Sequence, residues 1–332
     1  LRYNRPMRVL LVKLSSMGDV LHNLPVVSDL ARAYPDIEIE WVTEAAYAPL
    51  VMLHPGVRRA IPLQLRSLKK NWWSPAAWSA FLDSKNQLAN QTYDMVLDTQ
   101  GLLKSAFVAR WANGSVAGFS RRSAREPFAA RFYDQEIEVP RDLHAVKRNR
   151  QLAAGTFGYA LKDTVDYGLR FRAYPADFVR PFSQEKYAVF LHATSRANKM
   201  WPESHWIALG KRLHEIGIGV VLPWGSTDER RVSERLAGGI PGAISPTAMS
   251  LLHAAALLAE ASVVIGVDTG LAHLAVALAR PSVGLYVTTS PALTGLYGSS
   301  LAVNLGGGSP SQPTVPGVDE TWLAVGSLLG LA

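Results

Sequence analysis

Short apolar runs alternate along this chain with segments in which apolar residues recur at helical spacing. In the first half the runs are RVLLV (8–12), IEIEWVT (37–43), RRAIPL (58–63) and DMVLDT (94–99), and helical spacing follows the first run as far as Ala33. Apolar strands separated by helices are typical of βαβ units, which build a parallel sheet. The pattern predicts the α/β fold class.

The pattern is interrupted once and then starts again. Residues 172–186, RAYPADFVRPFSQEK, contain two prolines and mixed polarity, and we expect a domain boundary there. Beyond it come the apolar runs YAVFL (187–191), GVVL (219–222) and SVVIGV (262–267), with a helix predicted from Glu203 to Ile216. We predict two Rossmann-like domains, residues 1–176 and 177–332, facing each other across a cleft, with ligands at the carboxyl ends of the strands. The C-terminal tail is expected to pack back on the first domain.

Composition narrows the class of protein. The chain has 332 residues, of which 48% are hydrophobic and 18% charged, as in ordinary globular domains. It has no cysteine, which excludes disulfides, thiolate nucleophiles and cysteine zinc sites and fits a reducing compartment. The apolar run after Met7 ends at Lys13, so no secretory signal is expected. Later apolar stretches fall short of the roughly 20 residues that span a bilayer, so we expect a cytoplasmic protein.

The net charge of +7 is distributed unevenly. Residues 1–176 carry 24 Lys and Arg against 16 Asp and Glu, a balance of +8, whereas residues 177–332 carry 10 against 11, a balance of −1. Such asymmetry indicates a polyanionic ligand or an anionic membrane surface on the first half. A solvated basic surface is the alternative, and no motif supports nucleic acid.

The loop after the first run, SSMGD (15–19), ends on a carboxylate. It has one glycine where a dinucleotide fingerprint needs three, which argues against NAD. Taken alone, Asp19 could be the N-cap of the next helix, a role that aspartate favours. Because an interior proline removes a backbone hydrogen bond, the helix either kinks at Pro25 or begins there.

Four segments carry a resemblance to a known family. They are MRVLLVKLSSMGDVLHNLP (7–25), LHATSRANKMWPESHW (191–206), LPWGSTDE (222–229) and VDTGLAHLAVAL (267–278). Together they resemble the lipopolysaccharide heptosyltransferases of glycosyltransferase family 9, from about Met7 into the 290s but hardly beyond Leu301. The resemblance implies two Rossmann-like domains of the GT-B type. It also implies an ADP-heptose donor held by the second domain, and inverting transfer of heptose to the first Kdo of Kdo2-lipid A, the acceptor held by the first domain.

The implied reaction needs a base and a cation. A base takes the proton of the acceptor hydroxyl as its oxygen attacks C1, while the departing diphosphate gathers negative charge. By resemblance, Asp19 is that base and Lys199 is the second catalytic residue, opposing the charge of the diphosphate. Lys13 has either a direct role or the role of a satisfied charge at a strand end.

The donor residues are implied at the loops after the strands of the second half. Thr194, Ser195 and Lys199 would offer hydroxyls and an ammonium to phosphate oxygens. Asp268, Thr269 and Gly270 lead into a helix whose first amides form an anion site, and His273 lies one turn further. The resemblance adds Glu229 for the ribose, with Asp228 as the alternative, and Met249 for the adenine, although a core methionine is nearly as plausible. The chain has no D-x-D motif and no paired histidine ligands, so we expect neither a metal nor a cofactor.

The acceptor residues are expected in the basic first half. Two clusters and three further residues suit Kdo carboxylates and lipid A phosphates: Arg66, Lys69 and Lys70 beside Trp72 and Trp73; Arg121, Arg122 and Arg125; and Lys104, Ser16 and Gly18. The tryptophans could instead enter the membrane interface or stack on nucleic acid bases, although the resemblance argues against nucleic acid. We expect peripheral attachment to the anionic cytoplasmic face of the inner membrane of a Gram-negative bacterium. Two alternatives are a family 9 enzyme that adds the second heptose and a noncatalytic nucleotide-sugar-binding module.

Overall fold

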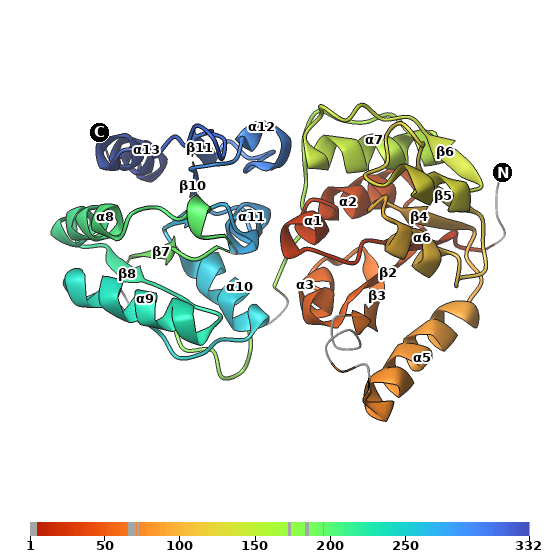
Figure 1. Cartoon of the computed structure of the whole chain (residues 1–332), viewed down its shortest axis with the longest axis horizontal. Helices are drawn as coiled ribbons and strands as arrows, with labels where there is room; N and C mark the ends of the chain where they lie inside the picture. The colour runs from red at the N-terminus through yellow and green to blue at the C-terminus, as the bar shows by residue number, and fades with distance from the viewer. Residues whose placement is uncertain are drawn as a thin grey trace. The chain divides into compact units, whose positions relative to one another are not determined.

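The computed structural model divides the chain into two compact units, residues 1–170 and 171–332 (Figure 1). It describes residues 5–65, 71, 73–171, 174–182, 186–194 and 196–331, with only the backbone of Ala77. The boundary between the units lies six residues before the predicted one, which separated residue 176 from residue 177. Each unit has its own sheet and its own core.

The first unit is built on a six-stranded parallel sheet in the order β3-β2-β1-β4-β5-β6. The strands are β1 (Arg8–Val12), β2 (Glu38–Glu44), β3 (Val57–Leu63), β4 (Met95–Asp98), β5 (Val116–Phe119) and β6 (Gln135–Ile137). The helices are α1 (Met17–Leu21), α2 (Leu24–Ala33), η1 (Ala45–Tyr47), α3 (Ala48–Val51), α5 (Pro75–Ala89), α6 (Leu103–Ala109), η2 (Pro127–Phe132) and α7 (Ala145–Phe157). The order is that of a Rossmann fold, in which the sequence of strands across the sheet reverses between β1 and β4.

The strand β1 is buried on both faces. Leu10 and Val12 belong to a core cluster with residues of α5, α6 and η2, so these helices cover one face of the sheet. Because βαβ crossovers are right-handed, α2 and α3 cover the opposite face. Pro25 lies in the first turn of α2, where its missing N–H has no partner to lose, so the second of the two predictions for this proline is confirmed.

The second unit has a five-stranded parallel sheet in the order β11-β10-β9-β7-β8. The strands are β7 (Tyr187–Leu191), β8 (Gly219–Val221), β9 (Val263–Val267), β10 (Ser282–Tyr286) and β11 (Ala302–Gly306). The helices are η3 (Ala197–Lys199), α8 (Glu203–Glu215), α9 (Thr227–Gly239), α10 (Leu251–Glu260), α11 (Gly270–Ala277), α12 (Pro291–Thr294) and α13 (Val318–Leu329). This is the flavodoxin-like order, which reverses between β7 and β9.

The helix predicted from Glu203 to Ile216 is α8, with Ile216 as its C-cap. The C-terminal helix α13 packs against α8 and β10 of its own unit, and the return of the tail to the first unit stays a prediction. None of the helices in the described part of the chain is both long and apolar enough to cross a membrane.

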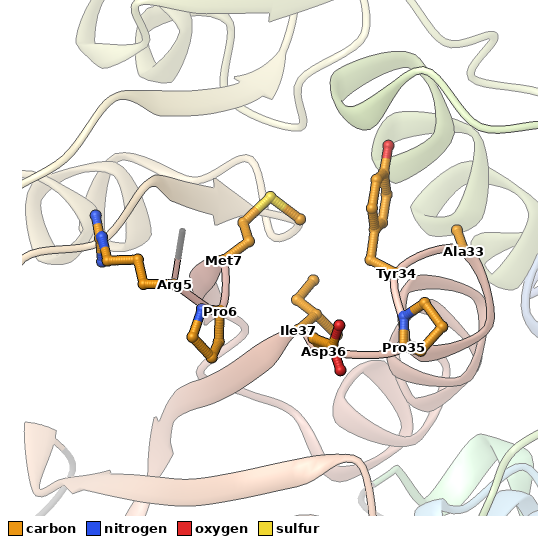
Figure 2. A pocket seen from close by; sticks show the side chains of 8 residues that line it. All are labelled: Arg5, Pro6, Met7, Ala33, Tyr34, Pro35, Asp36 and Ile37. Carbon is orange, nitrogen blue, oxygen red and sulfur yellow. The ribbon is translucent and has the colours of Figure 1, made fainter. Parts of the chain in front are cut away.

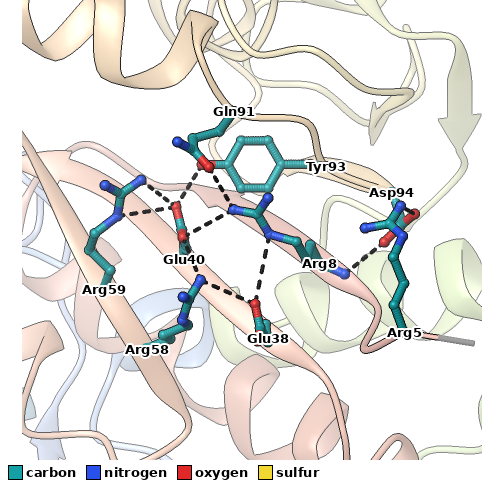
Figure 3. A network of polar contacts seen from close by, with 9 residues as sticks. All are labelled: Arg5, Arg8, Glu38, Glu40, Arg58, Arg59, Gln91, Tyr93 and Asp94. Atoms are coloured by element: carbon teal, nitrogen blue, oxygen red, sulfur yellow. Dashed lines mark hydrogen bonds and ion pairs between the residues drawn. The ribbon is translucent and has the colours of Figure 1, made fainter.

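A polar network lies on β1, β2 and β3 of the first sheet (Figure 3). Its centre is Glu40, a carboxylate only 2% exposed, which accepts hydrogen bonds from Arg59 Nη2 at 2.7 Å, Arg58 Nη1 at 3.3 Å and Tyr93 Oη at 2.7 Å. Burial opposes ionisation of this carboxyl, but the bonds from Tyr93 and Arg59 outweigh burial and lower the pKa of Glu40. The network joins three strands through one anion.

A hollow of about 460 Å³ opens at the amino ends of β1 and β2 (Figure 2). It is lined by Arg5, Pro6 and Met7 before β1 and by residues 33–37 before β2. Since open parallel sheets bind ligands at the carboxyl ends of their strands, we expect ligand-binding residues at the opposite edge.

Candidate active site

The first sheet reverses its strand order between β1 and β4, the position at which parallel sheets bind ligands. The loop 13–16 and the first turn of α1, which carries Asp19, follow β1, and the loop 99–102 follows β4. Gln100 joins them, because its Oε1 accepts from Leu14 N at 2.6 Å. Sequence reasoning missed Gln100, although its place directly after a buried strand was a usable signal.

Asp19 lies in the first turn of α1 and is not the N-cap of that helix. The N-cap of α1 is Ser16, and Asp19 is the third helical residue, so the alternative reading of Asp19 as the N-cap is wrong. Its Oδ2 accepts from Ser16 N at 3.1 Å and from Ser16 Oγ at 3.3 Å, as the acidic member of a capping box does. The side chain of Asp19 is 21% exposed.

Two of the predicted acceptor cations lie at the same edge. Arg125 Nη1 is 3.5 Å from Asp19 Oδ2, and Lys104 Nζ donates to Ser15 Oγ at 3.2 Å. Glu126 accepts from Leu103 N at 2.6 Å, which ties the loop that carries Arg125 to the start of α6. The structure therefore brings together residues that the sequence separates by about a hundred positions.

The other predicted acceptor residues differ in how they are placed. Ser16 is exposed and Gly18 is half-buried on the Asp19 loop, while Arg121 and Arg122 are exposed on the loop after β5. Trp73 is 68% exposed. Arg66, Lys69, Lys70 and Trp72 lie outside the described residues.

Lys13 is buried beneath this edge. Its Nζ donates to Thr99 O at 2.6 Å and to Asn149 Oδ1 at 3.4 Å. Burial lowers the pKa of Lys13 to about 8, although the nearby charge of Asp19 acts in the opposite direction. Lys13 thus ties β1 to the loop after β4, and its charge acts on Asp19 through space.

The second sheet reverses between β7 and β9, and three predicted donor residues meet there. Lys199 Nζ donates to Asp268 Oδ2 at 2.5 Å, and Thr194 Oγ1 donates to Asp268 O at 3.0 Å. The side chains of Lys199 and Asp268 are 17% and 15% exposed, so a ligand can reach the pair. Ser195, between Thr194 and Lys199, lies outside the described residues.

The helix α11 begins directly after Asp268. Thr269 is its N-cap and Gly270 its first residue, so the first amides of the helix are available to an anion. His273 lies in the next turn and is 6% exposed. Its contact with the donor stays a prediction.

Thr289 joins the same cluster from the loop after β10. Its Oγ1 donates to Asp268 Oδ2 at 3.0 Å, the oxygen that also accepts from Lys199. Sequence reasoning missed Thr289, although VTTSP follows an apolar run, SVGLY, as the other site loops do.

Glu229 and Asp228 differ in their surroundings. Glu229 is half-buried in the first turn of α9, and its Oε2 accepts from Gly225 N at 2.7 Å. Asp228 is 92% exposed and pairs with Arg231 at 3.1 Å. Met249 is half-buried just before α10. Of the two acids, Glu229 is the one held against a strand-end loop.

Within the part of the chain that the structure describes, no three His, Asp or Glu side chains gather as a metal site would require. The absence of a metal from the reaction stays a prediction.

The comparisons with known proteins agree with each other. The model of glycosyltransferase family 9 (heptosyltransferase) matches residues 82–320. Lipopolysaccharide heptosyltransferase 1 of Pseudomonas aeruginosa is 45% identical over 310 residues, covering 92% of this chain and 86% of the relative. The enzyme of the same name from Escherichia coli K12 is 42% identical over 301 residues, covering 90% and 93%.

Solved structures extend the likeness to the fold. E. coli heptosyltransferase WaaC with ADP superposes with a TM-score of 0.88 at 37% identity, covering 97% of this chain and all of that one. WaaC with ADP-2-deoxy-2-fluoro heptose gives a TM-score of 0.85 at the same identity, covering 97% and 99%. The predicted GT-B architecture of two Rossmann-like units is therefore confirmed. With a family model that matches most of its length and relatives above 40% identity, this chain belongs to glycosyltransferase family 9, the heptosyltransferases.

Proposed function

We propose that this chain transfers heptose from ADP-heptose to the lipopolysaccharide inner core, with the first Kdo of Kdo2-lipid A as acceptor and inversion at C1. The observation that carries the proposal is the cluster of Lys199, Thr194 and Thr289 on Asp268, directly before the amides of α11. A cation, hydroxyls and a helix start at one switch point form a site for a nucleoside diphosphate sugar. The relatives named for this activity support the choice of sugar.

In the proposed reaction Asp19 is the general base. The acceptor oxygen forms a bond to C1, the bond from C1 to the diphosphate oxygen breaks, and its electron pair leaves with ADP. Asp19 takes the proton of the acceptor hydroxyl. Because Oδ2 already accepts from Ser16, we assign the proton to Oδ1.

Lys199 and the α11 amides would stabilise the leaving diphosphate. The ammonium of Lys199 forms an ion pair with the carboxylate of Asp268. A bound diphosphate competes for the ammonium, while the bond from Thr289 keeps the Asp268 carboxylate in place. Fixed charges aimed at the leaving oxygen act most strongly in the transition state. We propose that these groups act without a metal, so excess chelator leaves the activity intact.

The basic first unit suits the acceptor. Its balance of +8 over residues 1–176 complements the Kdo carboxylates and lipid A phosphates. Arg125 and Lys104 lie beside Asp19 and would hold these anions near the base. We propose that the protein works at the cytoplasmic face of the inner membrane, attached peripherally, and binds no nucleic acid.

The test is incubation with ADP-heptose and Kdo2-lipid A, followed by mass spectrometry of the acceptor. Release of ADP together with one added heptose supports the proposal. Transfer only to an acceptor that already carries heptose would assign the protein to the second addition. Donor binding without turnover on either acceptor would identify a noncatalytic module.

A further inference from the structure

The outer surface of α6 and η2 exposes aromatic side chains. Phe107 on α6 is 51% exposed and Phe128 on η2 is 57% exposed. The ring of Phe132 on η2 lies 4.7 Å from that of Phe107, so α6 and η2 pack against each other. Two neighbouring elements that each expose a large ring present more apolar surface than the scattered apolar residues of an ordinary surface. We call this surface the α6–η2 face.

Cations surround these rings. Arg131 lies over the ring of Phe128, with Cζ 4.7 Å from its centre. Between residues 121 and 131 the exposed charged residues are four arginines and one glutamate: Arg121, Arg122, Arg125, Arg131 and Glu126. Aromatic rings among arginines match the interface of an anionic bilayer, where rings enter the headgroup region and cations meet phosphates.

The α6–η2 face adjoins the proposed acceptor edge. Lys104, in the first turn of α6, reaches Ser15 on the Asp19 loop, and Phe107 follows one turn later on the exposed side of the same helix. On the other element, Phe128 comes three residues after Arg125, which reaches Asp19. On both elements, the exposed ring therefore lies close to a proposed acceptor-binding residue.

We propose that the α6–η2 face docks on a bilayer rich in anionic lipid, with Phe107 and Phe128 entering the headgroup region. This inference rests on the proposed function, because an acceptor anchored by acyl chains presents its sugars just above the lipid surface. Docking there brings the Asp19 edge to the sugars without extraction of the lipid. The second unit, with a balance of −1 over residues 177–332, has no such excess of positive charge.

The test compares full-length variants in sedimentation with vesicles. The altered protein is Phe107→Ser with Phe128→Ser, and its matched control is Leu323→Ser, which changes a side chain 73% exposed on α13. Vesicles of phosphatidylethanolamine with phosphatidylglycerol are compared with vesicles of phosphatidylcholine alone. We expect the double variant to bind anionic vesicles at least tenfold more weakly, since it lacks the two rings that would be buried in the bilayer. The control should bind like the wild type.

A second variant guards against a folding defect. Phe107→Trp with Phe128→Trp keeps aromatic rings that favour the interface, so it should retain vesicle binding. Activity on a delipidated acceptor should be unchanged in both double variants, while activity on an acceptor embedded in vesicles should fall only in the serine variant.

Three results would overturn the docking surface. The serine variant could bind vesicles as well as the wild type does, or the wild type could bind phosphatidylcholine vesicles as well as anionic ones. The wild type could also form a dimer that the serine variant abolishes, which would make the face an interface between two copies of the chain. Failure of the proposed function gives a different result, since the wild type would then not modify the delipidated acceptor at all.

Discussion

At the residue scale, Asp19 combines a structural contact with a proposed chemical role. One oxygen of its carboxylate accepts the Ser16 amide at the start of α1 and lies near Arg125. The helix start thereby fixes the direction of the other oxygen, which a catalytic base requires. Its position shortly after a buried strand could be inferred from the chain, but the proximity of Arg125 could not, because only the tertiary fold brings residues 19 and 125 together.

Replacing Asp19 should separate these two roles. Asp19→Asn and Asp19→Ala should lower turnover by roughly 10²- to 10⁴-fold, the usual contribution of a general base, with little change in ADP-heptose affinity. Steady-state kinetics and donor titration measure the two quantities. Thermal unfolding of both variants measures the loss of the contact between Asp19 and the start of α1. If Asp19→Ala loses stability but keeps its activity per folded molecule, Asp19 is only a helix-capping residue.

Thr289 should contribute to activity through its hydrogen bond to Asp268. Thr289→Val removes a hydrogen bond to a charged acceptor while keeping the shape of the side chain, so kcat/KM for the donor should fall by roughly 10-fold. Thr289→Ser should restore most of the activity. Thr288→Val, the same change one residue earlier at a side chain 5% exposed, serves as the control and should have a smaller effect. Equal losses at both positions would indicate general damage to the β10 loop.

At the element scale, the strands with continuous apolar runs could be predicted and the weaker ones could not. β1, β4, β7 and β9 are runs of apolar residues whose ends are marked by polar loops. β5 has four residues with a glycine, and β6 is a three-residue edge strand that is partly exposed. Such segments form strands because a neighbouring strand pairs with them, and their own pattern carries little of that information.

The stability of the polar network on β1, β2 and β3 should depend more on the carboxylate of Glu40 than on that of Glu38. Glu40→Gln removes the buried anion on which Arg59, Arg58 and Tyr93 converge, and we expect a loss of about 2 kcal/mol in unfolding free energy. Glu38→Gln is the matched control, because Glu38 is 33% exposed and bridges some of the same arginines. Its effect should be within about 1 kcal/mol. Denaturant unfolding measures both, and equal effects would contradict a special role for burial.

His54 should make the first unit sensitive to acid. Its Nδ1 accepts from Gly56 N at 3.0 Å and its Nε2 lies 2.9 Å from Ser28 Oγ on α2, so the ring is held in its neutral form. Burial lowers the pKa of His54 from 6.5 to about 4. Between these values the unfolded chain binds the extra proton and the folded chain does not, so stability falls as the pH falls.

The loss from His54 should reach about 3 kcal/mol near pH 4. His54→Gln cannot bind that proton, so its unfolding free energy should decline less than that of the wild type between pH 6.5 and pH 4.5. Urea unfolding at both values gives the comparison. Parallel declines in the two proteins would show that other groups cause the acid sensitivity.

At the scale of the whole molecule, charge and chemistry divide between the units in the same way. The first unit carries the proposed base and the excess of cations, while the second carries the proposed diphosphate site among nearly balanced charges. Composition predicted the division of charge, whereas the base and the donor residues were implied by the family resemblance. The partners of each charge could not be predicted, since Lys199 binding Asp268 and Glu126 binding the start of α6 depend on loops that only the sheets bring together.

Salt should therefore affect the two substrates differently. Screening acts within about 8 Å at physiological ionic strength and weakens exposed charge pairs most, so raised salt should increase the acceptor KM more than the donor KM. Arg122→Glu should raise the acceptor KM, whereas Lys211→Glu, an equally large change of charge on the second unit, should leave it unchanged. Titrations with a delipidated acceptor at low and high salt provide the measurement. Equal salt sensitivity for both substrates would contradict the division.

The strand order of the first sheet also determines when its core can close during synthesis. The short helix α1 and then α2 follow β1, so one face of that strand can be covered soon after it leaves the ribosome. The other face waits for α5, α6 and η2, and β1 can pair with β4 only after residue 98 has emerged. Leu10 and Val12 thus remain uncovered on the nascent chain for most of the unit's translation, at a time when collapse onto a wrong partner competes with folding. This chain should need a chaperone early in its synthesis, before its second unit exists.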